Sequence, residues 1–481
     1  MNYSMVRFVL FRLLTVLGGL LILPLLVAII YREYTAAQIF FLVAISCLVL
    51  GVVGAHKKPL NKVIYAREGF FITAAAWIIM SIVGAVPFFL TGTIPDFVDA
   101  VFETVSGFTT TGGSILTSVD SMAKSVQFWR TFTHWVGGMG VLVFLIAVVP
   151  MADGYSMHLM RAESPGPVVG KIVPKVKDTA KILYLIYFAI TVVETVCLMI
   201  SGLGLYEAVT ISFSTAGTGG FAITDSGIGG YSTLTQGIIT VFMALCGVNF
   251  TVYYFLIQRK PKEAFAIDEV KFYFGVMLLS AFLIGLNVYM AGIVNNPGMS
   301  FHHALFTVAS VMTTTGFGTL DFDKWPMFSK TLLMGLALVG ACAGSTGGGF
   351  KFSRALIAVR NARNELNFLV HPKAVKRVFM DGHTLDGTTV KSVSAYLGLY
   401  VITMVASILV VSLDNFDYAT TVTSVIATLN NIGPGLSMVG PTGNYSQFSY
   451  LSKFVLMFDM LAGRLELLPM FIMLKPGTWK K

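Results

Sequence analysis

Charged residues are scarce in this chain. Lys, Arg, Asp and Glu together make up only 12% of its 481 residues, whereas 55% are hydrophobic. A soluble core does not account for so much apolar sequence, so the composition predicts a polytopic membrane protein. Cysteines are also few. All four (Cys47, Cys197, Cys246 and Cys342) fall within predicted spans, which excludes a disulfide framework and a cysteine metal cluster.

Lysine and arginine are almost missing from every second loop. Lys124 and Lys324 are the only ones in four loops, namely 93–126, 204–232, 294–327 and 414–447. The other loops are rich in them, with four each in 56–67, 151–177 and 258–271 and eight in 351–391. Basic loops stay in the cytoplasm, which predicts that both termini are cytoplasmic. This bias also explains the net charge of +9 without a nucleic-acid partner.

Ten apolar runs are long enough to cross a bilayer. They lie near residues 6–30, 36–55, 69–91, 128–150, 180–203, 233–257, 271–293, 328–350, 392–413 and 449–474. The first run is longer than the apolar part of a signal peptide and lacks a convincing cleavage site, so we interpret it as a spanning helix.

Four shorter segments lie between these runs and resemble one another. Each is an amphipathic stretch that ends in small hydroxyl or amide residues and glycine. They begin near Phe102, Tyr206, Leu305 and Thr421, and they end in TTTGG at 109–113, TAGTGGF at 215–221, TTTGF at 313–317 and NNIGPG at 430–435. A unit that recurs along a chain indicates a repeat architecture.

Each short segment predicts a helix of about three turns, too short to span a bilayer, followed by backbone that glycine turns away from the helix. Irregular backbone at membrane depth is tolerated only where it lines a polar cavity or is buried in protein. Four such loops around an axis would form a ring of carbonyl oxygens that could replace the hydration shell of an ion. The alternative for any one cluster is close helix packing, since small residues are enriched at membrane helix contacts.

We therefore predict an all-α polytopic membrane fold with about ten transmembrane helices and pseudo-fourfold symmetry. Two leading helices precede four parallel units of span, pore helix, filter loop and span. The predicted divisions are a leading hairpin at 1–55, repeats at 56–150, 151–257 and 258–360, and a basic connector with the fourth repeat at 361–481.

The second span of the first repeat contains WVGGMG at 135–140. With TTTGG, TTTGF, NNIGPG and the two extra leading helices, it resembles the Trk/Ktr/HKT superfamily of potassium transporters, and within it the membrane subunits of bacterial Trk systems. The resemblance covers essentially the whole chain. It implies a potassium-conducting homodimer in the bacterial inner membrane, with one pore per protomer and a cytoplasmic nucleotide-binding regulatory subunit of the TrkA type. The transported K⁺ is the only ligand implied, with no organic cofactor.

The resemblance also implies which residues form the potassium filter. The filter glycines map onto Gly112 and Gly316, while the second loop offers Gly219 or Gly220 and the fourth offers Gly433 or Gly435. The predicted filter residues are Thr110, Thr111, Gly112 and Gly113; Thr218, Gly219 and Gly220; Thr314, Thr315 and Gly316; and Asn431, Ile432, Gly433 and Gly435. A serine at the first filter glycine goes with sodium conduction in the family, so Gly112 favours potassium.

A second glycine cluster, GACAGSTGGGF at 340–350, lies inside the eighth apolar run. Glycine costs about 1 kcal/mol relative to alanine in a helix, so this run should break into a loop. The resemblance implies that the loop is the gate, formed by Gly344, Ser345, Thr346, Gly347, Gly348 and Gly349. The alternative is a packing face of small residues.

The last span contains three charged residues, Asp459, Arg464 and Glu466. Charge within a membrane span indicates a functional site by default. The resemblance implies that Arg464 faces the pore near the glycine loop and belongs to the gate. The alternative is an internal ion pair between Arg464 and one of the two acids.

The leading functional prediction is channel-like potassium uptake down the electrochemical gradient. The alternative is a symporter that couples potassium to H⁺ or Na⁺, although the repeats are parallel and the filter loops lack the carboxylates expected of that class. No nucleophile, base or metal-ligand constellation indicates an enzyme.

Overall fold

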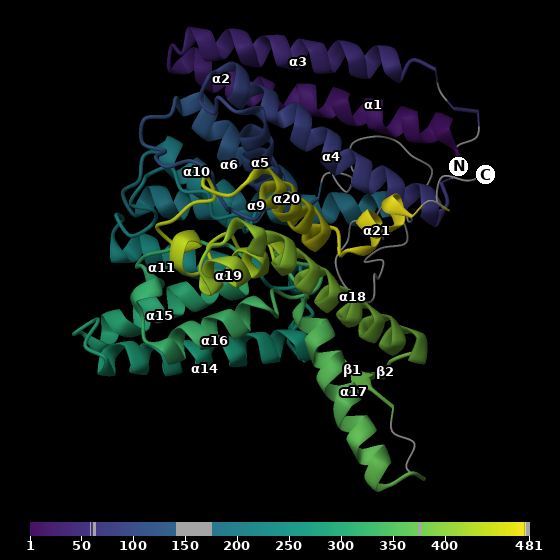
Figure 1. The fold of residues 1–481 in the computed structure, drawn as a ribbon, viewed down its shortest axis with the longest axis vertical. Coiled ribbons are helices and arrows are strands. Elements are labelled where there is room, and N and C mark those ends of the chain that lie inside the picture. Colours follow the sequence, from purple (N-terminus) through teal and green to yellow (C-terminus); the bar gives the residue numbers. More distant parts are fainter. Residues whose placement is uncertain (58, 61–63, 141–175, 374–376, 476, 478–481) are drawn as a thin grey trace.

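The computed structural model describes residues 1–57, 59–60, 64–140, 176–373, 377–475 and 477. Helices make up nearly all of the regular secondary structure of these residues (Figure 1). The strands among them are two residues each, β1 (Phe379–Met380) and β2 (His383–Thr384), which pair antiparallel after the helix α17 (Phe352–Val370). The predicted all-α membrane fold is confirmed for the described residues.

The leading hairpin consists of α1 (Tyr3–Leu20), α2 (Ile22–Ile30) and α3 (Tyr34–Gly54). Its two arms approach closely because glycine stands at their contact. A Cβ atom on Gly51 of α3 would lie 2.6 Å from the backbone nitrogen of Thr15 in α1. Small residues commonly allow such close packing between membrane helices.

Four short helices occupy equivalent places later in the chain. These are α5 (Phe97–Phe108), α10 (Leu205–Ala216), α15 (Pro297–Met312) and α19 (Tyr418–Leu429). A long helix precedes each of them: α4 (Ala66–Leu90), α9 (Val176–Ile200), α14 (Asp268–Met290) and α18 (Gly387–Val411). A shorter helix follows each of them: α6 (Lys124–Gly138), α11 (Thr233–Cys246), α16 (Met327–Ala337) and α20 (Tyr450–Arg464). This succession of elements is the predicted repeating unit.

Three of the four short helices begin at residues whose side chains cap the helix. The side chains of Asp96, Asn296 and Asp417 cap α5, α15 and α19, and each accepts hydrogen bonds from first-turn backbone N–H groups. Capping satisfies N–H groups that have no partner within the helix. Side chains thus fix the starts of α5, α15 and α19, and the glycine turns described below follow the ends of all four short helices.

Three of the four second spans are not continuous helices, which corrects part of the sequence prediction. The run 233–257 bends by 96° between α11 and α12 (Thr251–Ile257). The run 449–474 breaks between α20 and α21 (Leu468–Leu474), where Glu466 and Leu467 have φ of 60° and 62°. The run 328–350 leaves the helix after Ala337, as its glycines predicted. The part of the predicted span 128–150 beyond Gly140 lies outside the described residues.

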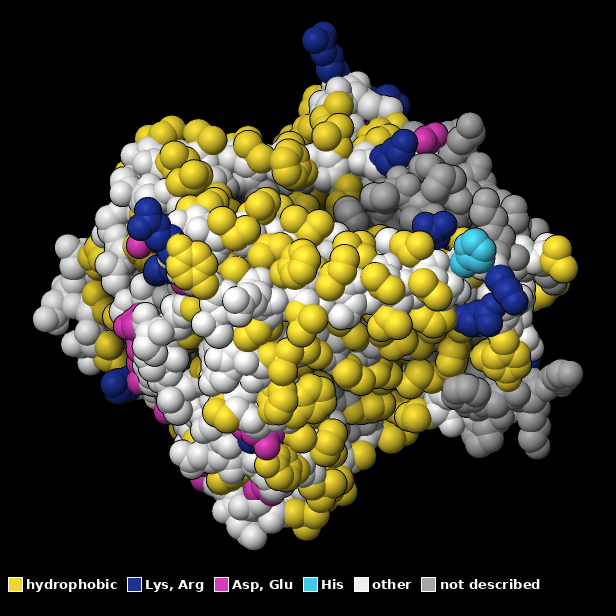
Figure 2. Space-filling model, turned by 90° about the horizontal axis from the view of Figure 1, so that it is seen from above, with side chains coloured by type: hydrophobic (Ala, Val, Ile, Leu, Met, Phe, Trp, Pro, Cys, Tyr) yellow, Lys and Arg dark blue, Asp and Glu magenta, His cyan; other side chains and the backbone are white. Residues whose placement is uncertain are grey.

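Among the described residues, six helices are long and apolar enough to cross a membrane, and the bent pair adds a seventh. The view in Figure 2 is dominated by hydrophobic side chains, with charged ones mostly near its margins. Phe41, Leu42 and Val53 of α3 are among the exposed apolar residues, at 58%, 57% and 68% exposure. Such exposure is costly in water but is expected against lipid. The chain is therefore a multi-pass membrane protein.

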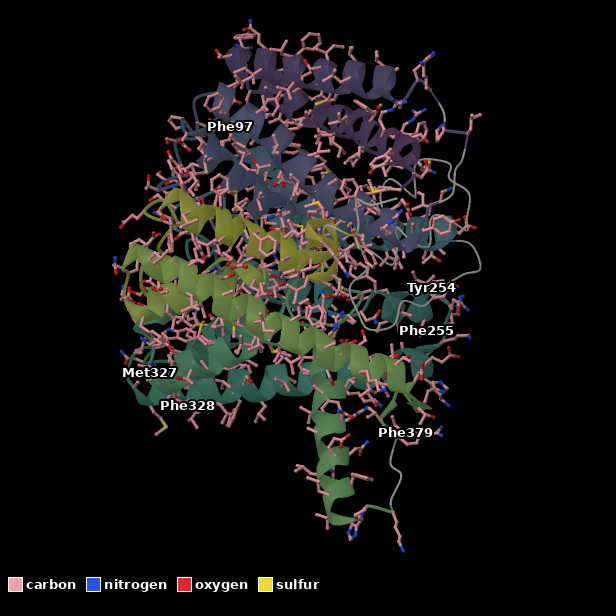
Figure 3. The ribbon with its side chains drawn as sticks, turned by 45° about the vertical axis from the view of Figure 1, so that its right-hand side comes forward. Phe97, Tyr254, Phe255, Met327, Phe328 and Phe379 are labelled. Carbon is pink, nitrogen blue, oxygen red and sulfur yellow. The ribbon has the colours of Figure 1, made fainter. Side chains whose placement is uncertain are left out.

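Exposed aromatic residues mark both ends of the helix layer. Phe97 and Phe328 lie toward one end in Figure 3, and Phe379 lies toward the other. The start of α1, the helix α21 and the β1–β2 hairpin all lie on one side of the molecule (Figure 1). On this side α17 (Phe352–Val370) projects away from the main body.

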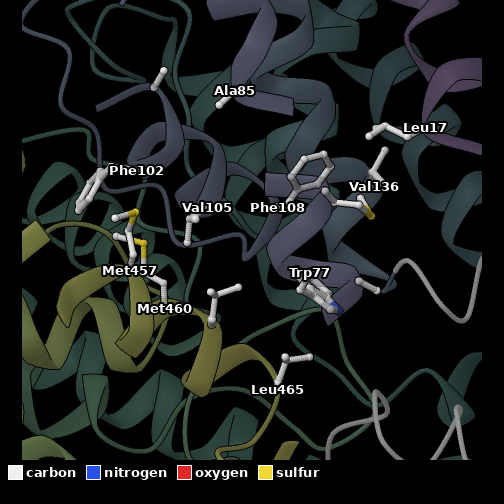
Figure 4. Packing of buried hydrophobic residues seen from close by; sticks show 14 of the residues in the cluster. Leu17, Trp77, Ala85, Phe102, Val105, Phe108, Val136, Met457, Met460 and Leu465 are labelled. Carbon is white, nitrogen blue, oxygen red and sulfur yellow. The ribbon is translucent and has the colours of Figure 1, made fainter. Parts of the chain in front are cut away.

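The first short helix is embedded in the core. Phe108 of α5 packs near Trp77 of α4 and Val136 of α6, while Met457 and Met460 of α20 lie on another side of the same cluster (Figure 4). All five side chains are buried. The core therefore holds α5 rigidly between both spans of its own unit and the last unit of the chain.

We predict that Gly137→Ala destabilises the protein by roughly 1–3 kcal/mol, the usual cost of overpacking. A Cβ atom at Gly137 would lie 1.8 Å from the carbonyl oxygen of Phe108. The matched control is Gly19→Ala in α1, where a Cβ atom would meet nothing within 4 Å. Melting temperatures in detergent should fall for Gly137→Ala alone, and equal values for both variants would contradict this packing.

Candidate functional site

The four short helices end in turns with the same backbone conformation. In each turn, two residues with positive φ flank one that is not in the left-handed region. The pairs are Thr110 and Gly112 (55° and 78°), Thr218 and Gly220 (53° and 82°), Thr314 and Gly316 (58° and 82°), and Asn431 and Gly433 (55° and 90°). Such alternation turns successive peptide groups toward one side of the chain. A threonine or asparagine in this conformation is uncommon, and the strain is typical of functional sites.

The middle residue of each turn is tied back to its own helix. The N–H groups of Thr111, Gly219, Thr315 and Ile432 donate to carbonyl oxygens five residues earlier, at 2.8–2.9 Å. These bonds satisfy carbonyls that the helix end would otherwise leave without partners.

The four turns meet one another in a closed ring. A Cβ atom built on Gly112 would lie 2.0 Å from the carbonyl oxygen of Gly219 in the next turn. The equivalent distances, from a Cβ atom built on the glycine to a carbonyl oxygen, are 2.0 Å from Gly220 to Thr315, 2.0 Å from Gly316 to Ile432, and 2.6 Å from Gly433 back to Thr111. Each turn thus contacts the next through a glycine and a carbonyl group, and the fourth returns to the first. No side chain fits at these glycines without moving the backbone.

The ring distinguishes the glycines that the sequence left open. Gly220 and Gly433 have the same conformation and contacts as Gly112 and Gly316. Gly219 occupies the place of Thr111, so its carbonyl group rather than its α-carbon lies against the neighbouring turn. Gly435 lies two residues beyond the ring and packs against Thr423. Gly113 follows the ring glycine of the first turn and faces the ring of Tyr445.

A single cavity of about 280 Å³ opens over the ring. All four turns line it, through Gly112, Gly220, Gly316 and Gly433. Asp225 and Asp321 also line this cavity. The Ser118 hydroxyl and the Val119 N–H donate to Asp225, and these hydrogen bonds hold the pKa of its carboxyl below the usual value. The mouth of the site therefore carries a carboxylate that stays ionised at neutral pH.

A buried ion pair braces the first two turns, and the sequence analysis did not identify it. Arg130 Nε lies 2.6 Å from Glu103 Oε1, and both side chains are at most 4% exposed. Glu103 also accepts from the N–H of Ile115 beyond the first turn, and Arg130 donates to the carbonyl of Ala222 beyond the second. Both residues occupy membrane-embedded helices, which was a signal that could have identified them.

His134 makes a second link between the same two turns. Its Nδ1 lies 2.7 Å from the carbonyl oxygen of Gly107, and its Nε2 accepts from the N–H of Phe221 at 3.2 Å. A neutral imidazole with its proton on Nδ1 satisfies both contacts. Arg130 and His134, two of the side chains that hold the ring together, thus lie directly before the resemblance motif at 135–140.

The predicted glycine loop lies against the third and fourth turns. A Cβ atom on Gly347 would lie 2.9 Å from the carbonyl oxygen of Thr313, and one on Gly348 would lie 2.7 Å from the Cβ atom of Asn431. The Gly348 N–H donates to the Thr314 hydroxyl at 2.7 Å. There is no room for side chains at these positions. The glycines therefore allow close packing in a loop that interrupts the helix, and they do not form one face of a continuous helix.

The hydroxyls of the glycine loop are engaged within the protein. Ser345 donates to the Cys342 carbonyl at 2.6 Å, and Thr346 donates to the Cys246 carbonyl at 3.2 Å. Gly344 has a φ of 69° and accepts from the Phe250 N–H at the bend between α11 and α12. The loop is therefore a folded element rather than a loose connection.

Arg464 joins the glycine loop to the end of α6. Its guanidinium donates to the carbonyl of Thr346 at 2.5 Å and to the carbonyl of Gly137 at 2.6 Å. The acids of the alternative interpretation have other partners: Asp459 accepts from Ser407, and Glu466 forms an ion pair with Arg354. The geometry thus favours a contact between Arg464 and the loop over an internal pair.

Comparison with known proteins identifies the family. The TrkH family, described as a cation transport protein, matches residues 36–477. The Trk system potassium uptake proteins TrkH of Salmonella typhimurium and Escherichia coli K12 are each 33% identical to this chain and are matched over the whole of both chains. The crystal structure of the potassium transporter TrkH from Vibrio parahaemolyticus superposes with a TM-score of 0.89, at 30% identity and full coverage of both chains.

A fourfold ring of re-entrant turns in a multi-pass helical protein defines a membrane transport protein of the pore-loop class. The family match over nearly the entire chain is specific. The chain belongs to the TrkH family of cation transport proteins. The resemblance drawn from the sequence motifs is confirmed.

We predict that Glu103→Ala costs about 3–5 kcal/mol of stability, because it leaves Arg130 as an uncompensated buried charge. The control is Glu263→Ala, which removes the partner of Lys260 in an ion pair whose side chains are both about half exposed. Surface pairs contribute at most about 1 kcal/mol, so the control should unfold like the wild type. Chemical unfolding in detergent measures both, and similar midpoints would contradict a bracing role.

Proposed function

We propose that this chain conducts potassium ions through the ring of four turns, into the cell and down their electrochemical gradient. The observation that carries the proposal is the closure of the ring, in which each glycine contacts a carbonyl of the next turn. Paired left-handed residues in all four turns support a carbonyl-lined path. The relatives named for potassium uptake support K⁺ as the ion.

The electrostatics of the site favour a cation. The helices α5, α10, α15 and α19 end directly before the four turns. A helix C-terminus carries about half a negative charge, so the four ends together attract a cation beneath the ring. Asp225 and Asp321 at the mouth add negative potential on the entry side. An inside-negative potential contributes about 2.3 kcal/mol per charge per 100 mV, enough for uptake without ATP hydrolysis by this chain.

The glycine loop is the proposed barrier to conduction. It packs directly against the third and fourth turns, where an ion leaving the ring would have to pass. Arg464 holds the loop by hydrogen bonds to Thr346 and brings a positive charge to the same place. Displacing the loop would remove both the steric and the electrostatic obstacle.

The proposed assembly is a homodimer in the bacterial inner membrane, with both termini in the cytoplasm and a regulatory subunit of the TrkA type on that side. The projecting helix α17 supports it. Leu366, Leu369 and Val370 near its end are 66%, 75% and 71% exposed, which suits burial against another chain. Mass measurement of the complex in detergent, with and without the nucleotide-binding subunit, tests both contacts.

The second candidate is a symporter that couples potassium to protons. Glu194 of α9 favours it, because this carboxyl is fully buried within a helix long and apolar enough to cross the membrane. A carboxyl in such surroundings could carry a proton.

Reversal potentials of the reconstituted protein in opposed K⁺, Na⁺ and H⁺ gradients separate the two candidates. The reversal potential of a channel follows the potassium gradient alone. The reversal potential of a proton-coupled symporter shifts with pH, and Glu194→Gln would abolish that shift.

We predict that Gly112→Ser lowers the permeability ratio of K⁺ over Na⁺ by about tenfold, the effect of about 1.4 kcal/mol in relative binding. The side chain would collide with the Gly219 carbonyl at a φ of 78° and redirect it. The control, Gly318→Ser, introduces the same hydroxyl in the mouth, where a Cβ atom meets its nearest neighbour at 3.5 Å. Bi-ionic reversal potentials report the ratio. An unchanged value for Gly112→Ser would remove this glycine from the filter.

We also predict that Arg464→Ala raises basal potassium flux more than tenfold. Each hydrogen bond from a charged donor contributes roughly 1.5–3 kcal/mol, and losing them favours the displaced loop. Arg464→Lys keeps the charge but loses the planar fork, so its flux should be intermediate. Liposome flux assays compare the variants without a regulatory subunit, and wild-type flux in Arg464→Ala would rule out the gating role.

A further inference from the structure

A single carboxylate closes the ends of the glycine loop. Glu269, the second residue of α14, accepts through the same oxygen from the N–H of Ala343 at 2.7 Å and from the N–H of Ser353 at 2.8 Å. Ala343 precedes the glycines and Ser353 lies in the first turn of α17. The Phe352 N–H also donates to the Ala341 carbonyl. These hydrogen bonds therefore hold the two ends of the loop together.

The contacts of Glu269 are not those of an ordinary acid at a helix start. Such a residue typically stabilises the N–H groups of its own first turn. Glu269 is 2% exposed, and both donors that contact its oxygen belong to the loop and to α17. Hydrogen bonds to a charged acceptor are roughly twice as strong as neutral ones. The charge is thus placed to hold the loop in one position.

The residue before Glu269 connects the same point to the surface of the protein. Asp268 accepts from Arg360 of α17 at 3.0 Å, and its backbone N–H donates to Asp381 at the turn of the β1–β2 hairpin at 2.8 Å. Arg360 also donates to the carbonyl of Phe379 in β1 at 2.6 Å. The projecting helix and the hairpin are therefore tied to α14 one residue away from the contact that holds the loop.

We propose that Glu269 is a positioning residue that holds the glycine loop in place, and that Asp268 transmits movements of α17 and the hairpin to it. The inference rests on the proposed function in one respect, that the loop is the barrier to conduction. A partner that draws α17 away from α14 would break the Asp268 contacts, strain the two bonds to Glu269 and free the loop. A movement of α17 would then act directly on the loop, because α17 begins where the loop ends.

The native thiol of Cys342 reports the loop position without relying on flux. It is fully buried in the structure, directly before Ala343. In a background with Cys47, Cys197 and Cys246 replaced by serine, a membrane-impermeant thiol reagent applied to inside-out vesicles reaches Cys342 only when the loop moves. The melting temperature of this background and of each variant is measured in parallel, and labelling is carried out well below it.

Glu269→Gln preserves the shape of the side chain but removes its charge. We expect Cys342 to be labelled about tenfold faster and potassium flux to rise, a factor that corresponds to about 1.4 kcal/mol. The matched control is Glu263→Gln on α13 (Pro261–Ala266), an exposed acid just before α14. It should match the background in both readouts.

Asp268→Asn should raise labelling by a smaller factor, because the bonds of Glu269 remain. The double variant should label no faster than Glu269→Gln, since both changes act on one path. Fully additive effects would overturn the transmission from α17.

The outcomes separate this inference from the proposed function. Faster labelling with unchanged flux would support the positioning role but show that the loop is not the barrier. Unchanged labelling in Glu269→Gln would overturn the inference, whether or not the melting temperature falls, because a merely structural role lowers stability without exposing the thiol.

Discussion

The structure depends on one constraint, that backbone which leaves the helix at membrane depth must find partners within the protein. Each of the four turns meets it in the same way, by returning the N–H of its middle residue to the preceding short helix. The glycines then let each turn approach the carbonyl of the next. No turn completes these contacts alone. The site therefore exists only as a closed ring, and the long helices around it serve to bring the four parts together.

The fold could be predicted because its signals are repeated. Long apolar runs, short amphipathic segments and basic loops recur in a fixed order, and each repetition strengthens the interpretation of the others. The breaks in the second spans were less predictable. The bend between α11 and α12 follows Gly247, and the break before Leu468 follows Arg464 and Glu466, but a single glycine or a few charged residues also occur in continuous helices and do not by themselves predict a break. At the bend between α11 and α12, tertiary contacts with the glycine loop determine the conformation. One of them is the hydrogen bond from the Phe250 N–H to the Gly344 carbonyl.

The candidate site was predictable where residue type forces conformation. Gly112 and Gly316 each follow directly on three threonines, whereas the second turn lacks this threonine run and its adjacent glycines left the register open. Only the backbone angles and inter-turn contacts single out Gly220 and Gly433. The bracing pair of Glu103 and Arg130 was missed, since the partners are far apart in the sequence and only the fold brings them together. The same is true of the bonds between Glu269 and the loop.

The ring is fourfold in its backbone but not in its surroundings. The ion pair and His134 brace the first two turns, while the glycine loop contacts the third and fourth. A channel built from four identical subunits cannot make this distinction, because any substitution enters all four quarters at once. Here the four quarters are encoded separately in one gene. Each can change alone, so evolution can adjust ion preference in small steps on one side of the path while leaving the closing mechanism on the other side intact.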